Sequence, residues 1–317
     1  IRWLYYGSWV PNTAYAKVAF DFAHRMRNGV EYMGRGFRAG WPLLGVTAVC
    51  LFAAWRIKRR GPSFPFRGSG VLLGWIAIYV AYILYVGGDN LPGLRFFLPI
   101  LTAIFLSAGW CISTVAEHLS PQKKRIVQVA LLIAVVGTNV LTYRATSRGY
   151  RGDMKLAQAW CKVGRWIDRE TPEDVVIATP VPGAMGYFGK RTTIDMLGLT
   201  DAVVAQQGQV YSGGAHGHAR YHTNYIYERD PDLMIHMSSG RSKTPLYTSP
   251  DKIFRWTGYA VYDFASDPRC AERYEFATAT LDDGTLVEML KRREQIASTV
   301  MDEHEPLPPL VVSASAP

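Results

Sequence analysis

The chain of 317 residues is long enough for two domains, or for a membrane part and one globular domain. Its mean hydropathy is close to zero, but residues 41–143 are mostly apolar and residues 144–317 are mixed. The net charge of +9 does not indicate nucleic-acid binding, because the densest basic runs, RIKRR (56–60) and QKKRI (122–126), flank apolar runs. Lys and Arg residues that set the orientation of a membrane protein lie beside its apolar spans.

An amphipathic helix is predicted near the amino terminus. From Tyr15 to Met26 apolar residues recur at i, i+3, i+4 and i+7, which is the helical period. Asn12 or Thr13 is suited to cap this helix. The preceding aromatic residues suit a membrane interface or stacking on a sugar ring; they are Trp3, Tyr5, Tyr6 and Trp9. We therefore expect residues 1–40 to form an outer amphipathic segment.

Four apolar runs predict an α-helical membrane bundle of four transmembrane helices over residues 41–143. They are WPLLGVTAVCLFAAW (41–55), GVLLGWIAIYVAYILYVG (70–87), FFLPILTAIFLSAGWCISTVA (96–116) and IVQVALLIAVVGTNVLTY (126–143). A span needs about 20 mostly apolar residues, and the first run needs its neighbours to reach that length. The alternative is an apolar helical core of a soluble protein.

The distribution of Lys and Arg predicts which side of the membrane each loop faces. Basic residues gather between the first and second runs and between the third and fourth, so these loops are expected to be cytoplasmic. The connection 87–95 and residues 144–300 are then extracytoplasmic. Residues 1–40 also carry several arginines, which does not fit an outer segment. The topology is assigned from the short loops rather than from this long segment.

The outward-facing turn VGGDNLPGLRFFLP (86–99) is unusually polar for a connection between two apolar runs. Gly87 and Gly88 permit a tight backbone. Asp89 lies near the edge of a low-dielectric layer, where an acid costs free energy unless it is paired or used. Either Asp89 and Arg95 pair to stabilise the turn, or both bind a charged substrate head group.

Residues 144–300 are predicted to form an α/β domain, followed by a disordered tail at 301–317. A helix is expected near 153–169 and a short helix around YIYERD. The expected strands are 175–180, 192–197 and 232–237, with a hairpin formed by 274–280 and 285–292. The two cysteines of this part, Cys161 and Cys270, are predicted to form a disulfide, since an oxidising compartment permits one.

Two further patterns in this part are ambiguous. Gly183, Gly186 and Gly189 follow a strand but lack the GxGxxG spacing, and Asp195 comes too early to contact a ribose. The histidines of GAHGHARYH could bind a metal or form a polar loop that contacts glycan; they are His216, His218 and His222. Because no cysteine or carboxylate stands at metal-site spacing, the polar loop is favoured.

Several of these stretches together resemble the GT-C superfamily of bacterial membrane glycosyltransferases, in particular the actinobacterial terminal arabinofuranosyltransferase-like proteins. The similar stretches are YYGSWVPNTAYAK (5–17), VGGDNLPGLRFFLP (86–99), VGRWIDRETPEDVVIAT (163–179), GAMGYFGKRTTIDMLGLTD (183–201) and GHAR (217–220). The resemblance covers most of residues 1–295. The usual catalytic acid of such enzymes lies in the first outer loop, so we expect it upstream of Ile1.

The resemblance implies a polyprenyl-phosphate sugar donor, a cell-envelope glycan as acceptor and transfer outside the cytoplasm. Lys17 and Arg95 are then expected to contact the donor phosphate. Asn12 is expected in the same pocket, Asn90 on sugar hydroxyls and Tyr6 on a sugar ring. Asp89 is the best-placed candidate for the catalytic base. No cofactor is identified, and the pattern is compatible with a divalent cation.

A second function from another class is a non-catalytic membrane component whose outer domain binds cell-wall glycan. A transporter fits poorly, because no charged residue stands in the middle of an apolar run. The predicted partners are therefore the lipid-linked donor, the glycan and membrane lipids, without nucleic acid.

Overall fold

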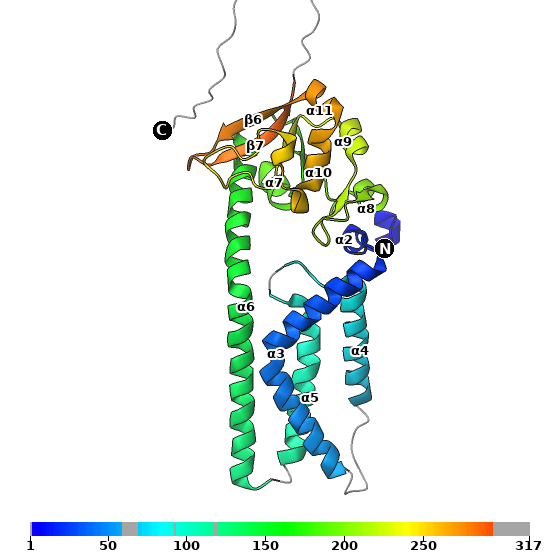
Figure 1. Cartoon of the computed structure of the whole chain (residues 1–317), viewed down its shortest axis with the longest axis vertical. Coiled ribbons are helices and arrows are strands. Elements are labelled where there is room, and N and C mark those ends of the chain that lie inside the picture. The colour runs from blue at the N-terminus through cyan, green and yellow to red at the C-terminus, as the bar shows by residue number, and fades with distance from the viewer. Residues whose placement is uncertain (1, 59–68, 92, 117–118, 294–317) are drawn as a thin grey trace, which may run out of the picture. The chain divides into compact units, whose positions relative to one another are not determined.

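The computed structural model of the protein describes residues 2–58, 69–91, 93–116 and 119–293 (Figure 1). The chain divides into two compact units. We call residues 20–152 the helical unit, and residues 1–19 together with 153–317 the sheet unit. Their boundaries differ from those predicted at 40 and 143, because residues 1–19 group with the tail domain.

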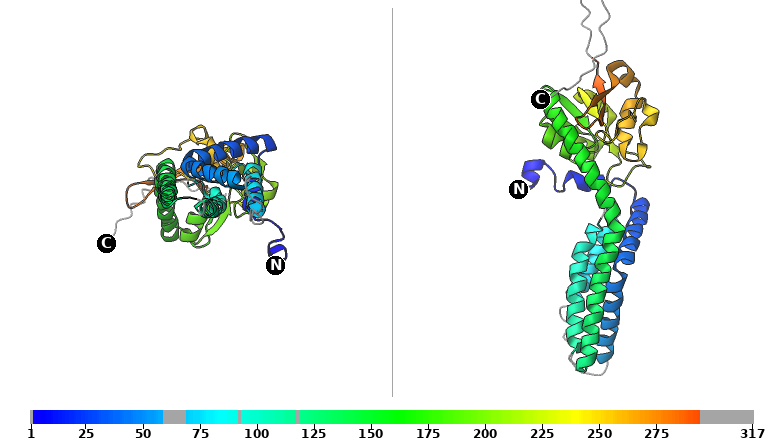
Figure 2. Two further views of the ribbon diagram at one scale, coloured as in Figure 1. Left: turned by 90° about the horizontal axis from the view of Figure 1, so that it is seen from below. Right: turned by 90° about the vertical axis from the view of Figure 1, so that its left-hand side faces the viewer.

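The helical unit consists of helices that contain the four predicted apolar runs. They are α3 (Phe22–Lys58), α4 (Ser69–Val86), α5 (Leu98–Ala116) and the first part of α6 (Pro121–Glu170), with the short 3-10 helix η2 (Arg95–Phe97) before α5. Figures 1 and 2 show these helices side by side from three directions. The predicted outward turn is the link between α4 and α5.

A small apolar core joins α3, α4 and α5. Its buried residues are Tyr32, Met33, Ile83, Phe97 and Ile100. Glycines in α3 let the helices approach closely, since a Cβ added at Gly29 would lie 2.8 Å from the Cα of Leu84. A Cβ at Gly36 would collide with the ring of Phe97.

Helix α6 is the one helix within the described ranges that is long and apolar enough to cross a membrane. Only 11% of its most apolar window is buried, so it is not the covered core helix of a soluble protein. The apolar stretches Gly74–Val86 and Arg95–Leu106 are shorter than the about 20 residues of a span. The structure therefore supports one candidate span as weak evidence for a membrane protein, and not the four that were predicted.

The sheet unit is built on a mixed five-stranded sheet with the order β2-β1-β5-β7-β6. The strands are β1 (Val176–Thr179), β2 (Thr192–Asp195), β5 (Leu233–Ile235), β6 (Tyr274–Thr280) and β7 (Leu286–Arg292). β1 runs parallel to β2 and β5, whereas β7 is antiparallel to β5 and β6. All five predicted strands are present, and the predicted α/β class of this part is confirmed.

Helices cover both faces of this sheet. On one face, Val163 and Ile167 of α6 and Met185 of α7 (Pro182–Gly189) pack on β1, β5 and β7. On the other face lies a second apolar cluster, made with helices α8 (Ala202–Gln207), α9 (Thr223–Arg229), α10 (Arg255–Ser266) and α11 (Pro268–Arg273). The remaining elements of this unit are short: α1 (Arg2–Tyr6), α2 (Asn12–Lys17), β3 (Gln209–Val210), β4 (Arg220–Tyr221) and η3 (Pro250–Lys252).

The single helix predicted from Tyr15 to Met26 is wrong, because the chain leaves the helix between α2 and α3. The Asp21 carboxylate accepts a hydrogen bond from the His24 N–H, at 2.8 Å, and so satisfies the start of a new helix. The N-cap of α2 is Pro11, and Asn12 is its first helical residue. In contrast, the helix predicted near 153–169 is the end of the continuous helix α6.

The predicted disulfide is also wrong, because both cysteines are free. Cys270 is buried in the cluster on the α10 face of the sheet, whereas Cys161 belongs to α6, which packs on the opposite face. The sheet therefore separates the two thiols. The disordered tail predicted at 301–317 lies outside the described residues.

Candidate functional site

The turn between α4 and α5 holds a buried carboxylate against a half-exposed guanidinium. The Asp89 side chain is 5% exposed and that of Arg95 is 48% exposed. Arg95 donates from Nε to Oδ2 of Asp89, and from Nη2 to Oδ1 at 3.1 Å. The hydrogen bond to Asp89 raises the pKa of Arg95. The ion pair therefore forms, as the first interpretation of this turn predicted.

The backbone of this turn explains why its sequence contains glycines. Gly87, Gly88 and Gly93 have positive φ angles of 79°, 78° and 100°, a region that side chains with a Cβ rarely enter. A Cβ added at Gly88 would lie 2.6 Å from Cβ of Tyr32. The turn thus packs against α3, and Asn90, the neighbour of Asp89, stays exposed.

The other predicted substrate-binding residues belong to the sheet unit. α2 packs on α8, with Ala16 buried in this contact region. A Cβ added at Gly217 would lie 3.8 Å from Cγ of Lys17. Two of the stretches that carry the resemblance, residues 5–17 and 217–220, are therefore neighbours in the fold. That Asn12 and Lys17 face one pocket with Asp89 stays a prediction.

Tyr6 belongs to an exposed aromatic group at the start of the chain. The Tyr6 side chain is 66% exposed, and the nearby rings of Trp3 and Trp9 stack with their centroids 6.1 Å apart. Ser8 ties down the turn that follows, since its hydroxyl donates to the Val10 carbonyl oxygen at 2.9 Å. The exposure of these rings suits contact with a sugar ring or a membrane interface.

In the histidine loop, as elsewhere among the described residues, no group of three or more metal-binding side chains occurs. His222 caps α9, because its Nδ1 accepts the Tyr225 N–H at 3.3 Å. His218 Nδ1 lies 3.3 Å from the carbonyl oxygen of His216. These contacts agree with the interpretation as a polar loop.

The glycine-rich segment does not present an acid for a nucleotide. It forms α7, the crossover between the parallel strands β1 and β2. The Asp195 carboxylate accepts hydrogen bonds from the Leu197 N–H at 2.9 Å and the Thr200 N–H at 2.6 Å. Burial raises the pKa of Asp195. The Asp195 carboxylate therefore stabilises the turn after β2.

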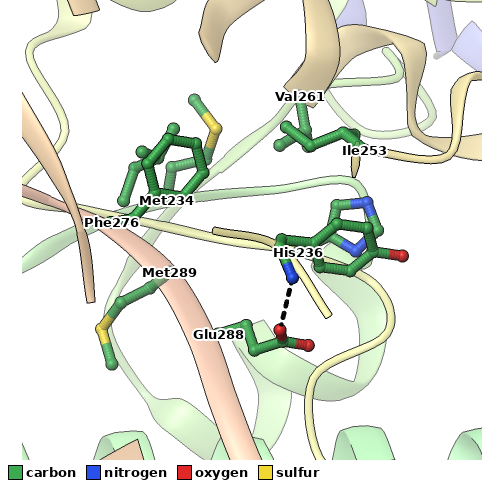
Figure 3. A pocket seen from close by; sticks show the side chains of 9 residues that line it. Met234, His236, Ile253, Val261, Phe276, Glu288 and Met289 are labelled. Atoms are coloured by element: carbon green, nitrogen blue, oxygen red, sulfur yellow. Dashed lines mark hydrogen bonds between the residues drawn. The ribbon is translucent and has the colours of Figure 1, made fainter. Parts of the chain in front are cut away.

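A small pocket between the sheet and α10 contains two polar residues that the sequence did not suggest (Figure 3). His236 is 5% exposed and Glu288 is 2% exposed. The remaining lining is mostly apolar: Met234, Tyr247, Ile253, Val261, Phe276, Met289 and Leu290. Burial lowers the pKa of His236 to about 3, so the imidazole is neutral at physiological pH.

The sequence carries little signal for this pocket. Glu288 stands between Val287 and Met289 in a strand that was predicted as half of a hairpin. β7 is an inner strand between β5 and β6, and helices cover both faces of the sheet, so the acid is buried.

Comparison with known proteins identifies one family. Residues 144–293 match the family model described as "Domain of unknown function (DUF8728)". No curated protein and no solved structure matches the chain. The matched range contains the entire five-stranded sheet, so the sheet unit resembles a family whose function is not known.

Proposed function

We propose that this chain is the carboxy-terminal part of a membrane glycosyltransferase that moves a sugar from a polyprenyl-phosphate donor to a cell-envelope glycan. The observation that carries the proposal is the Asp89–Arg95 pair at the end of the apolar stretch Gly74–Val86. A buried carboxylate orients a half-exposed guanidinium there. A guanidinium is well suited to bind a phosphate with two hydrogen bonds.

In the proposed reaction, an acceptor hydroxyl oxygen bonds to the anomeric carbon of the donor sugar. The bond between that carbon and the phosphate oxygen breaks, and polyprenyl phosphate leaves with the electron pair. A carboxylate takes the hydroxyl proton. Both oxygens of Asp89 accept hydrogen bonds from Arg95, so we assign Asp89 first to positioning Arg95 on the phosphate. Its action as the base requires this pair to open.

Residues 5–17 of the sheet unit are proposed to bind the donor, as Arg95 and Asn90 of the helical unit are. Lys17 adds a second cation for the phosphate, Asn12 and Asn90 bind sugar hydroxyls, and Tyr6 stacks on a sugar ring. The closeness of Lys17 to Gly217, where an added Cβ would lie 3.8 Å from Cγ of Lys17, supports a joint role for residues 5–17 and the GHAR loop.

We further propose that α6 crosses the membrane and that residues 144–300 are extracytoplasmic. The exposure of large apolar side chains along the first part of α6 supports this topology, because soluble proteins rarely expose large apolar patches. An alkaline phosphatase fused after residue 300 is expected to be active. An inactive phosphatase and an active cytoplasmic reporter at the same position would contradict the topology.

The function is tested by transfer from radiolabelled polyprenyl-phosphate sugars in membranes that contain the full-length protein. Arg95→Ala is expected to raise the donor KM at least about tenfold and to change kcat less, as loss of a ground-state phosphate contact predicts. Arg148→Ala, an exposed arginine on α6, is the matched control and should change neither constant. Absence of transfer with every donor of this class would refute the proposal.

The second candidate is a non-catalytic membrane component that binds glycan. The exposed rings of Trp3, Tyr6 and Trp9 favour it, since aromatic rings stack on sugars. Under this alternative, purified protein binds cell-wall glycan, and Trp9→Ala weakens that binding, while no sugar is transferred.

A further inference from the structure

The first half of α3, residues 22–41, has a row of exposed apolar side chains along one side. We call this row the apolar stripe; it consists of Phe22, Val30, Phe37 and Trp41, with exposed fractions of 61%, 58%, 52% and 65%. Their spacings of 8, 7 and 4 residues lie close to whole turns of an α-helix. The four side chains therefore point to the same side of the helix.

The side next to the apolar stripe is basic. Arg27, Arg35 and Arg38 are exposed, and their spacing keeps them on one side of the helix; we call them the basic stripe. The single acid of this half of α3 is Glu31, so its net charge is positive. Arg38 donates from Nε to the carbonyl oxygen of Gly34 at 3.2 Å. A guanidinium has five N–H groups, so this arginine retains donors for an anion.

The third side of this half of α3 packs inside the helical unit. Tyr32 and Met33 belong to the apolar core that α3 forms with α4 and α5. A Cβ added at Gly29 would lie 2.8 Å from the Cα of Leu84, so α4 covers this side closely. The apolar stripe is therefore additional to the core of the unit, and its exposure needs another explanation.

The apolar stripe begins beside the candidate membrane span. Trp41 precedes Pro42, and a Cβ added at Gly137 would lie 3.8 Å from Cγ of Pro42. Gly137 belongs to the apolar run 126–143 of α6. Pro42 also lies inside a helix, where proline causes a bend, and Figure 1 shows that α3 changes direction along its length. The first half of α3 can therefore leave the direction of the span and follow a membrane surface.

These observations favour a membrane surface with anionic lipids as the partner of the two stripes. A helix with one apolar and one basic side lies at the boundary between headgroups and acyl chains, and basic residues near that surface attract anionic lipids. Arginine reaches the phosphates while its methylene groups stay on apolar surface. A second copy of the chain fits less well, because a symmetric interface would bring two basic stripes together.

We propose that the exposed sides of residues 22–41 bind the surface of a membrane that contains anionic lipids. The apolar stripe enters the boundary between headgroups and acyl chains, and the basic stripe contacts the lipid phosphates. This inference does not depend on sugar transfer, because it rests only on residues of the helical unit.

The test places the photocrosslinker p-benzoylphenylalanine at Phe37 of the full chain, which is reconstituted in nanodiscs of equal amounts of phosphatidylcholine and phosphatidylglycerol. Phe37 is exposed and the probe keeps the phenylalanine ring, so the fold should be retained. Irradiation is expected to produce lipid adducts, which mass spectrometry identifies. The same probe at Tyr187, an exposed residue of α7, is the control for exposure alone and should produce fewer lipid adducts.

Charge variants connect the adducts to the basic stripe. With the probe at Phe37, phosphatidylglycerol adducts should exceed phosphatidylcholine adducts at least about threefold, because basic residues attract anionic headgroups. Replacement of Arg27, Arg35 and Arg38 by Gln is expected to bring this ratio close to one. The matched control replaces three exposed arginines of the sheet unit by Gln, which changes the net charge equally and should leave the ratio unchanged: Arg165, Arg169 and Arg241.

The outcomes separate lipid from other partners. Lipid adducts that prefer phosphatidylglycerol only when the basic stripe is present support the proposal. An adduct that joins two copies of the chain would assign this face to a dimer and overturn it. Absence of lipid adducts at Phe37, or equal ratios with and without the basic stripe, would also overturn it. If the triple variant fails to fold in a thermal unfolding assay, the three single replacements decide, since each should lower the ratio in part.

Discussion

The guanidinium of Arg95 binds both carboxylate oxygens of Asp89, only six residues earlier in the chain. The Asp89 side chain is buried and the Arg95 side chain is half exposed. An arrangement of this kind fixes the direction of the guanidinium, because its planar group must align with the carboxylate. Asp89 therefore affects the binding of any ligand that Arg95 contacts, because it sets the orientation of the guanidinium.

Asp89→Asn in the full-length protein is expected to leave folding intact, because it keeps the side-chain shape, and to lower sugar transfer at least about tenfold. That loss corresponds to about 1.4 kcal/mol of transition-state stabilisation. If Asp89 positions Arg95, the donor KM rises and the pH profile of transfer is unchanged. If Asp89 is the base, kcat falls and the acidic limb of the profile disappears.

The matched control for this variant is Asp153→Asn, which removes an exposed acid from α6. Full transfer activity in both variants would assign the Asp89–Arg95 pair to turn stability alone.

Gly88→Ala is expected to destabilise the helical unit. Gly88 has a φ of +78°, and a Cβ there would lie 2.6 Å from Cβ of Tyr32, so the substitution combines backbone strain with overpacking. We expect a cost of at least about 2 kcal/mol and a lower midpoint of thermal unfolding in detergent. Gly74→Ala is the control: no atom lies within 4 Å of its added Cβ, so this midpoint should stay the same or rise. An unchanged midpoint for Gly88→Ala would show that the turn does not pack as described.

Local patterns in the sequence predicted most elements of the sheet unit. The strands at 175–180 and 192–197 correspond to β1 and β2, and the hairpin formed by 274–280 and 285–292 corresponds to β6 and β7. The strand order was not accessible, because pairing of β7 with β5 depends on contacts between distant parts of the chain. Burial of Glu288 requires α10 and other distant parts of the chain to cover the sheet, and for this reason its pocket could not be predicted.

Predictions near element ends failed where a single side chain decides the outcome. The apolar period runs from Tyr15 to Met26 without interruption, but the helix does not. It breaks between α2 and α3, where Asp21 starts a new helix. The basic stretch after Tyr143 has no proline, so α6 continues through it. An Asp89–Arg95 pair was one of the two interpretations of this turn, and it could be considered because within one short turn sequence distance limits spatial distance.

Acid should destabilise the sheet unit through His236. The folded-state pKa is lowered to about 3 by burial, below the unfolded value of about 6.5. Between these values the unfolded chain binds the proton and the folded chain does not, so stability is lost as pH falls below about 6.5. The loss approaches 1.4 kcal/mol per pH unit, or about 2 kcal/mol on going from pH 6.5 to pH 5.

The measurement is thermal unfolding of wild-type protein and His236→Gln across this pH range. Glutamine does not titrate, so the variant should show a flatter dependence, whereas His24→Gln, a partly buried histidine of α3, should behave as the wild type. Parallel curves for wild type and His236→Gln would mean that His236 is not buried in a neutral form.

The two cysteines of the sheet unit should differ in reactivity and should not be linked. Burial raises the pKa of the Cys270 thiol to about 11, and the thiolate is the reactive form. Cys161 is only partly buried. In non-reduced native protein, a maleimide is expected to modify Cys161 at least about tenfold faster than Cys270, with equal rates after denaturation. Mass spectrometry of the labelled peptides measures both sites, and Cys161→Ser, which removes the fast phase, assigns it. A peptide pair linked by a disulfide would show that the two thiols meet, which the separation of their positions by the sheet forbids.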